Sequence, residues 1–290
     1  MTESVWNRWP ASPRRLSFGA ILPMAEESAF GDETPHFPDI LEMTRVANDV
    51  GFEAVWIVDH FVFRPEENSQ FSMPGTSDER GVWECFTLMA GLAAATERIN
   101  IGSLVACTGF RNPGLVAKMV ETIDDISGGR TILGLGAGWH KPEYDAFGYP
   151  YDHRVARFEE AVEIIAPLLR EGRVDYQGEY FQANDAVNRP RGPRPQGAPI
   201  LVGSNGPRML RTIARYADAW NTVWHGSPDA VVEQMAAVDA ACVEMGRDPR
   251  TLERTAGGNI AMPGTTGRRP NPITGSDEEI AATIVRFRDL

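Results

Sequence analysis

The most informative segment of the chain is Arg130-Thr-Ile-Leu-Gly-Leu-Gly-Ala-Gly-Trp139. Its continuous apolar run predicts a parallel strand that is buried on both faces. We interpret the glycines at 134, 136 and 138 as places where a ligand can approach the backbone. A second stretch, Pro199-Ile-Leu-Val-Gly-Ser-Asn-Gly-Pro207, has the same form and then opens a helix. Two such strand ends predict a site for one flat, phosphate-bearing ligand.

The composition excludes several classes of protein. The chain has 290 residues, 28 basic and 40 acidic, and a net charge of −12, which argues against nucleic acid or an anionic membrane as a main partner. Cys85, Cys107 and Cys242 are far apart, which argues against disulfides and a zinc site and fits a reducing compartment. Residues 1–15 lack the apolar core of a signal peptide, and no run approaches the ~18 apolar residues of a membrane span. We therefore expect a cytoplasmic protein.

Strand and helix patterns alternate along the chain. Repeating units of this kind imply a parallel sheet with right-handed crossovers. Seven units without a change of pattern favour a (β/α)8 TIM barrel over a doubly wound sheet. Strands are predicted over 16–22, 52–58, 99–107, 130–136, 200–203, 219–223 and 254–261, and helices over 37–50, 83–96, 113–123, 154–170, 207–217, 227–245 and 276–287.

The eighth unit of the barrel has no counterpart before the end of the sequence at Leu290. We expect a truncated chain; the alternatives are a barrel that closes with seven strands or with the help of a partner. The domain prediction is a single barrel domain over 1–290 with an insertion at about 172–198. Within that insertion, Val174–Phe181 predicts a small hairpin around Gly178. The insertion over 172–198 and the polar loop over 64–81 are both long enough to suggest functional or mobile loops. For the insertion, a tolerated surface insertion without a function is an equal alternative.

Two strand ends carry residues suited to chemistry. Asp59 and His60 follow the strand over 52–58 at its carboxyl end, where barrel active sites lie. A histidine there can exchange a proton near neutral pH, although a structural histidine is the alternative. The turn Gly203–Gly206 precedes a helix N-terminus, which can bind phosphate; the alternative is an ordinary turn.

Other sites are less well supported. The glycine run fails the dinucleotide fingerprint because Trp139 and Lys141 stand where its third glycine is needed, and no GxxxxGK[ST] motif occurs. A metal site for hydrolysis is an open alternative, with Asp59 or Glu143 adding a carboxylate. Its other ligands would be the histidines His60, His140 and His225, but no HExxH spacing exists. Trp139 and Trp224 suit a flat aromatic ligand better.

A set of motifs occurs in a fixed order between about residues 16 and 225. They are Val55-Trp-Ile-Val-Asp-His-Phe61, Gly109-Phe-Arg-Asn-Pro113, Ile126–Trp139, Glu143-Tyr-Asp-Ala-Phe-Gly148, Arg157–Ile165, Ile200-Leu-Val-Gly-Ser-Asn-Gly206 and Ala214–Asn221. Together they make the chain resemble the luciferase-like monooxygenase superfamily of flavin- or deazaflavin-dependent barrels. Within that superfamily it is most similar to the coenzyme F420-dependent oxidoreductases.

The resemblance implies that a cofactor lies across the barrel mouth. It implies that His60 handles the proton and that Asp59 contacts the ring edge or the ribityl chain. It also implies a non-prolyl cis peptide at the end of the third strand, where the backbone would lie against the cofactor ring. The implied cofactor-binding residues are Asp59, Val105, Ala106, Cys107, Gly136, Ala137, Gly138 and Trp139 around the ring, and Gly203, Ser204, Asn205 and Gly206 at the phosphate.

The implied activity is hydride transfer between F420 and a small organic substrate. Trp139 stands where F420-dependent sugar-phosphate dehydrogenases have a glutamate, so reduction of an activated alkene or carbonyl, or a monooxygenase reaction, is favoured. The alternatives are an FMN-dependent monooxygenase with a separate flavin reductase, and a non-catalytic flavin-binding barrel. Arg111, Arg208 and Arg211 could form a basic groove for the F420 tail. The resemblance also implies a homodimer.

Overall fold

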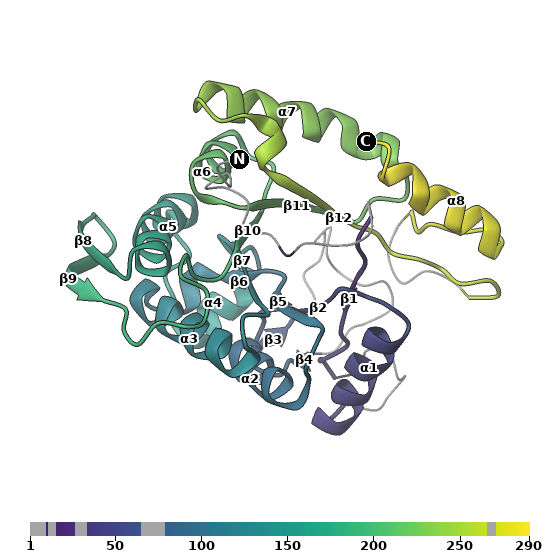
Figure 1. Ribbon diagram of the computed structural model, residues 1–290, viewed down its shortest axis with the longest axis horizontal. Helices are drawn as coiled ribbons and strands as arrows, with labels where there is room; N and C mark the ends of the chain where they lie inside the picture. The colour runs from purple at the N-terminus through teal and green to yellow at the C-terminus, as the bar shows by residue number, and fades with distance from the viewer. Residues whose placement is uncertain (1–9, 11–15, 27–33, 65–78, 266–270) are drawn as a thin grey trace. The chain divides into compact units, whose positions relative to one another are not determined.

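The computed structural model describes residue 10 and residues 16–26, 34–64, 79–265 and 271–290 (Figure 1). These residues fall into two compact units. The larger unit comprises Ser17–Arg64 and Glu79–Val202, and the smaller unit is described mainly over Gly203–Leu290. The interpretations of the N-terminal segment 1–15 and of most of the loop 64–81 concern residues outside the described ranges.

The larger unit contains a curled parallel sheet whose strands follow the order of the chain. Each strand pairs in parallel with the next, and β2 and β7 are buried along their whole length, as their apolar runs predict. This order has no reversal, unlike that of a doubly wound sheet. The α/β class and the parallel sheet are therefore confirmed. The strands are β1 (Gly19–Ile21), β2 (Ala54–Ile57), β5 (Asn100–Ser103), β7 (Thr131–Gly136) and β10 (Ile200–Gly203).

The helices of this unit are those that the periodicity predicts, with one addition. In α3, the Asn112 side chain accepts hydrogen bonds from the amides of Gly114 and Leu115, and the helix ends at Gly128 with φ 66°. The helix α4 (Lys141–Phe147) was not predicted, because seven residues are too few to show an apolar stripe. The predicted helices are α1 (Phe37–Asp49), α2 (Cys85–Ala95), α3 (Pro113–Ser127) and α5 (Arg154–Arg170).

The third predicted strand is interrupted. It forms β5 and the short β6 (Ala106–Cys107), and both pair with β7. The peptide bond between Leu104 and Val105, at the interruption, is cis. The single strand over 99–107 was therefore wrong, whereas the non-prolyl cis peptide is confirmed.

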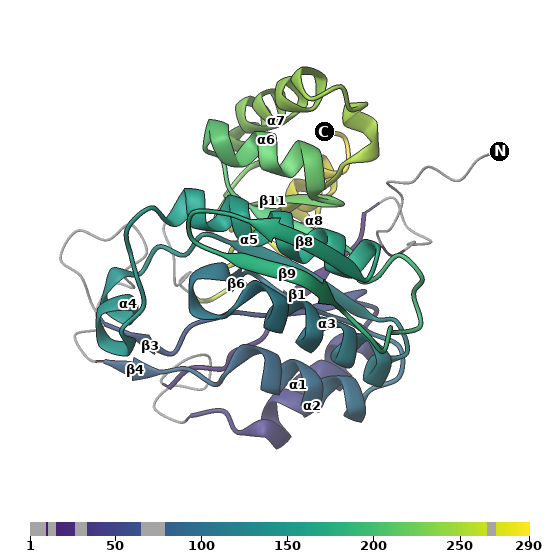
Figure 2. The ribbon, with the colours of Figure 1, turned by 90° about the vertical axis from the view of Figure 1, so that its left-hand side faces the viewer.

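The predicted hairpin is present as the antiparallel strands β8 (Arg173–Gln177) and β9 (Gln182–Val187), beside α5 in Figure 2. Glu160 of α5 binds the hairpin turn by accepting hydrogen bonds from the amides of residues 179, 180 and 181, at 2.8, 2.8 and 2.9 Å. Two arginines that follow the hairpin pair with buried carboxylates of α3: Arg191 with Glu121 and Arg194 with Asp124. Arg191 and Arg194 therefore have a structural role.

The smaller unit contains a parallel pair of strands, β11 (Ala219–Val223) and β12 (Glu253–Gly257). Helix α6 (Pro207–Tyr216) packs against α7 (Val232–Glu244). Helix α8 (Asp277–Phe287) begins with a capping box formed by Ser276 and Glu279. Among the described residues, we find no helix with the length and apolar composition that a transmembrane segment requires.

Candidate active site

Side-chain hydrogen bonds join the carboxyl ends of three strands in the larger unit. Asp59, which follows β2, accepts a hydrogen bond from the amide of Cys107 at the end of β6, at 2.8 Å. Glu143 of α4, which follows β7, accepts hydrogen bonds from the amides of Phe61 and Val62, at 2.5 and 3.1 Å. The ends of β2, β6 and β7 therefore meet, as the parallel arrangement predicts.

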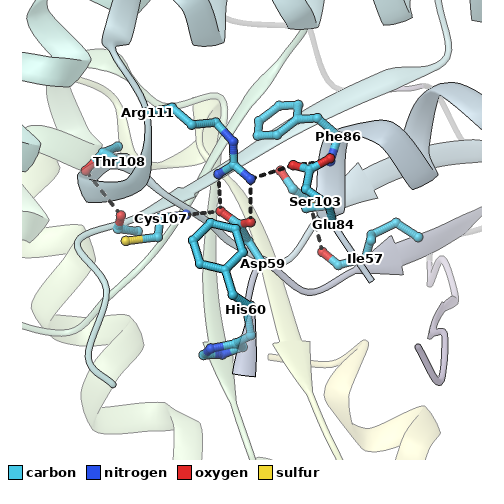
Figure 3. Close-up of polar contacts among 12 residues, drawn as sticks. Ile57, Asp59, His60, Glu84, Phe86, Ser103, Cys107, Thr108 and Arg111 are labelled. Atoms are coloured by element: carbon cyan, nitrogen blue, oxygen red, sulfur yellow. Dashed lines mark hydrogen bonds and ion pairs between the residues drawn. The ribbon is translucent and has the colours of Figure 1, made fainter. Parts of the chain in front are cut away.

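Asp59 forms a buried ion pair with Arg111 (Figure 3). Two guanidinium nitrogens of Arg111 donate to the two carboxylate oxygens, at 2.7 and 2.9 Å, and one also donates to Glu84 at 2.6 Å. Burial disfavours the charged guanidinium, but the hydrogen bonds and charge of Asp59 outweigh it and raise the pKa of Arg111. The Arg111 side chain is only 9% exposed. The interpretation that Arg111 contributes to a groove for an anionic tail was therefore wrong.

We expect Asp59→Asn to lower the free energy of unfolding by about 3 kcal/mol, because it leaves a buried guanidinium with one carboxylate instead of two. Denaturation by urea measures this. The matched control is Asp49→Asn, which removes an ion pair with Arg98 whose side chains are 72% and 75% exposed. That change should cost less than about 1 kcal/mol. Equal losses in the two variants would contradict the structural importance of the Asp59 pair.

His60 binds Glu143 through one of its two ring nitrogens. Its Nδ1 lies 2.7 Å from Glu143 Oε2, and the side chains of His60 and Glu143 are 15% and 1% exposed. Within the described ranges, the structure gives Nε2 of His60 no hydrogen-bond partner. The rings of Phe63 and Trp139 lie 4.4 and 5.5 Å from the imidazole, centroid to centroid. His60 is therefore a half-buried base among aromatic side chains.

Cys107 and Tyr144 connect β6 to the segment after β7. Cys107 Sγ lies 2.9 Å from Tyr144 Oη, and the same hydroxyl is 3.0 Å from the carbonyl oxygen of Ala137. Burial raises the pKa of Cys107 to about 12 and also raises the pKa of Tyr144. Both groups are therefore neutral at physiological pH, and Cys107 is not a thiolate nucleophile.

The glycines of β7 and of the segment that follows it are required by packing within the protein. A Cβ at Gly134 would lie 2.0 Å from the carbonyl oxygen of Ser103, and one at Gly136 would lie 2.6 Å from Val105 Cγ2. Gly138 has φ 74°, and a Cβ there would lie 2.0 Å from Tyr144 Oη. The interpretation that the missing side chains leave room for a ligand was therefore wrong. Protein atoms fill the space that a Cβ would occupy at these three positions. Cofactor contacts at Gly136 and Gly138 stay predictions.

The predicted phosphate turn, Gly203-Ser-Asn-Gly206, lies in the smaller unit. Gly206 is the N-cap of α6, and no side chain among the described residues caps the helix there. Among the residues that the structure describes, no atom lies within 4 Å of a Cβ added at Gly206. Trp220 Nε1 fixes the turn by donating to the carbonyl oxygen of Ser204 at 2.8 Å. The described residues therefore leave space beside the amide end of α6 at Gly206.

Comparison with known proteins identifies the family. Residues 16–265 match the sequence profile of the luciferase-like monooxygenases. The chain belongs to this family.

Relatives within the family differ in activity. The chain is 34% identical over 174 residues to a 5,10-methylenetetrahydromethanopterin reductase of Archaeoglobus fulgidus, covering 60% of this chain and 46% of the relative. It is 40% identical over 172 residues to the pyrimidine monooxygenase RutA of Cronobacter sakazakii, covering 57% and 50%. The chain thus spans about half the length of these curated relatives. It shares its fold with an F420-dependent secondary alcohol dehydrogenase (TM-score 0.74, 20% identity, 94% of this chain and 90% of that one).

Within the larger unit, the structure brings together the predicted residues at the ends of β2, β6 and β7. The predicted phosphate turn, Gly203–Gly206, belongs to the smaller unit. Within the described ranges, no group of three or more His, Cys, Asp or Glu side chains is placed to hold a metal. The metal alternative used His140, whose Nε2 accepts from the amide of Arg64, and His225, which hydrogen-bonds to Thr222. The residues that contact one another in the site of the larger unit are Asp59, His60, Cys107, Ala137, Trp139, Glu143 and Tyr144.

Sequence reasoning missed two residues of the site. The sequence predicts Glu143 only as an alternative metal ligand and predicts no role in the site for Tyr144. Both stand shortly after the glycine-rich strand, within a motif quoted for the family resemblance. Their position after a strand that ends at the site was the only signal in the sequence.

Proposed function

We propose that the chain is an oxidoreductase on the (β/α)8 barrel plan that uses coenzyme F420 for hydride transfer to or from a small organic substrate. The observation that carries this proposal is His60 at the carboxyl end of β2, whose Nδ1 is bound by Glu143 and whose Nε2 has no hydrogen-bond partner among the described residues. Membership of a family that contains reductases and monooxygenases supports a redox activity.

The residues present fit such a cofactor at two places, one in the smaller unit and one in the larger unit. The open amide end of α6 suits a phosphate group, because free N–H groups and the helix dipole favour an anion. In the larger unit, Asp59 and Tyr144 hold the segment that ends at Cys107, so this backbone can support a flat ring without moving. The aromatic rings of Phe63 and Trp139 lie beside His60, at 4.4 and 5.5 Å between ring centroids.

When bound, the cofactor supplies or accepts the hydride. The protein's part is then the accompanying proton. In the oxidation of an alcohol, the C–H electron pair leaves with the hydride, and Nε2 of His60 accepts the hydroxyl proton as the carbonyl forms. In the reduction of a carbonyl, a protonated His60 returns that proton to the oxygen. Glu143, whose Oε2 lies 2.7 Å from Nδ1, orients the ring for this transfer.

A second candidate is an FMN-dependent monooxygenase that works with a separate flavin reductase. The identity of 40% to a pyrimidine monooxygenase supports it. The two candidates differ in the anionic tail, which only F420 carries. Arg208 and Arg211 are exposed on α6, beside the proposed phosphate turn, and favour F420.

Calorimetric titration with F420 and with FMN tests the proposal. We expect F420 to bind and FMN to bind weakly or not at all. Gly206→Asp should weaken cofactor binding at least about tenfold, because its carboxylate lies where the phosphate would bind. The fold should not suffer, since Asp is a good N-cap.

The matched control is Gly206→Ala, which adds a Cβ into the same open space without charge and should bind the cofactor like the unmodified chain. Tight binding of FMN alone would replace F420 by FMN in the proposal. A sample that binds neither cofactor would refute both candidates.

A further inference from the structure

We propose that Glu143 is a positioning residue that holds His60 as the Nδ1–H tautomer, so that the unprotonated Nε2 faces the substrate. The chemical consequence of this tautomer rests on the proposed function. The tautomer itself is a property of the chain alone and can be measured without a cofactor.

The two oxygens of Glu143 have different partners. Oε1 accepts hydrogen bonds from the amides of Phe61 and Val62. Oε2 lies 2.7 Å from Nδ1 of His60. Backbone amides can only donate, so Oε1 must remain an acceptor whatever the protonation of the ring. Because the first oxygen is fixed in this way, the second is directed at the imidazole.

This arrangement determines which ring nitrogen carries the proton. An ionised carboxylate only accepts, so Nδ1 of His60 must be the donor, and in the neutral ring Nε2 is then the unprotonated nitrogen. Nε2 is also the nitrogen that has no partner within the described ranges.

The packing of the ring supports the same orientation. Phe63 and Trp139 lie against the imidazole, at 4.4 and 5.5 Å between ring centroids. The other nearby titratable ring, His140, lies 6.2 Å away, and its Nε2 accepts from the amide of Arg64. Among the described side chains, Glu143 alone makes a hydrogen bond to His60, so it is the group that selects the tautomer.

Glu143→Gln provides a sharp test because the variant keeps the shape and reverses the hydrogen bond. The amides of Phe61 and Val62 require an acceptor, so the Gln carbonyl oxygen must take the place of Oε1. The Gln NH2 group then occupies the position of Oε2 and donates to Nδ1 of His60. The neutral ring is thereby forced into the Nε2–H tautomer, in which Nε2 can no longer accept a proton.

Nitrogen-15 NMR of the histidine rings reads the tautomer directly, at a pH well above the ordinary histidine pKa of ~6.5. His60→Asn assigns the His60 signals by removing them. We expect an unprotonated Nε2 in the unmodified chain and an unprotonated Nδ1 in Glu143→Gln. The control, Glu171→Gln, changes an exposed glutamate and should leave the signals unchanged. An Nε2–H tautomer in the unmodified chain, or no reversal in Glu143→Gln, would overturn the proposal.

Turnover provides the second measurement. Glu143→Gln should lower turnover ~100-fold or more while cofactor affinity changes little, because only the proton transfer is blocked. A reversed tautomer with unchanged turnover would overturn the positioning role. If the unmodified chain turns over with neither F420 nor FMN, the proposed function fails, and the NMR measurement still decides whether Glu143 sets the tautomer.

Discussion

Gly134→Ala should destabilise the larger unit by at least about 3 kcal/mol. The added Cβ would lie 2.0 Å from the backbone carbonyl oxygen of Ser103. This oxygen belongs to the neighbouring strand β5 and cannot rotate away as a side chain could. The hydroxyl of Ser103 also bonds to both the amide and the carbonyl oxygen of Gly134, at 2.9 and 2.8 Å. Accommodating one methyl group therefore requires β5 and β7 to separate, and urea denaturation measures the cost.

The control for this change is Gly114→Ala in the first turn of α3. Its nearest atom to a new Cβ is Asn112 Oδ1 at 3.2 Å, and alanine is the better helix former. We expect a change in the free energy of unfolding within about 1 kcal/mol in either direction. If Gly134→Ala unfolded at the same urea concentration as the unmodified chain, close packing would not be the reason for glycine at this position.

His60→Ala should lower turnover by a factor of ~10²–10⁴, the range expected when a general acid–base group is removed. Cofactor affinity should change little, because His60 is proposed to exchange a proton with the substrate and not to bind phosphate. Steady-state kinetics measures turnover and calorimetry measures affinity. Glu143 would lose its imidazole partner but keep the amides of Phe61 and Val62, so the fold should be retained.

His153→Ala is the matched control, because His153 is 63% exposed and lies outside the site. It should leave turnover unchanged. Equal turnover in His60→Ala and in the unmodified chain would remove His60 from the mechanism, provided that circular dichroism shows the variant to be folded.

Most of the long helices and strands could be predicted from the sequence, because they depend on residue patterns that are local. The predicted bounds of β10, β11 and α5 agree with the structure, since turn residues or clear periodicity mark both ends. The short elements could not be predicted in this way. The strands β3 (Val62–Phe63) and β4 (Arg80–Gly81) each have two residues, and β4 lies at the end of the segment that the sequence predicts as a loop over 64–81.

The candidate site was less predictable, because its key contacts join residues that are distant in the sequence. His60 could be found from its position after a strand, but its partner Glu143 is 83 residues further along the chain. Asp59 was expected to contact a cofactor, and the pair with Arg111, 52 residues away, has no local signal. Glycine-rich strand ends have two physical explanations, ligand approach and close packing, and both give the same sequence. The structure shows that Ser103 and Val105 fill the space where side chains at Gly134 and Gly136 would lie.

The contacts of Glu143 set a condition for redesigning this protein. Loops of barrel enzymes are often exchanged one at a time to change substrate range. Here one carboxylate binds the connection after β2 through two amides and an imidazole, while it is itself carried by the connection after β7. Grafting either connection alone would leave the other without its counterpart, so the two should be transplanted together and at unchanged length.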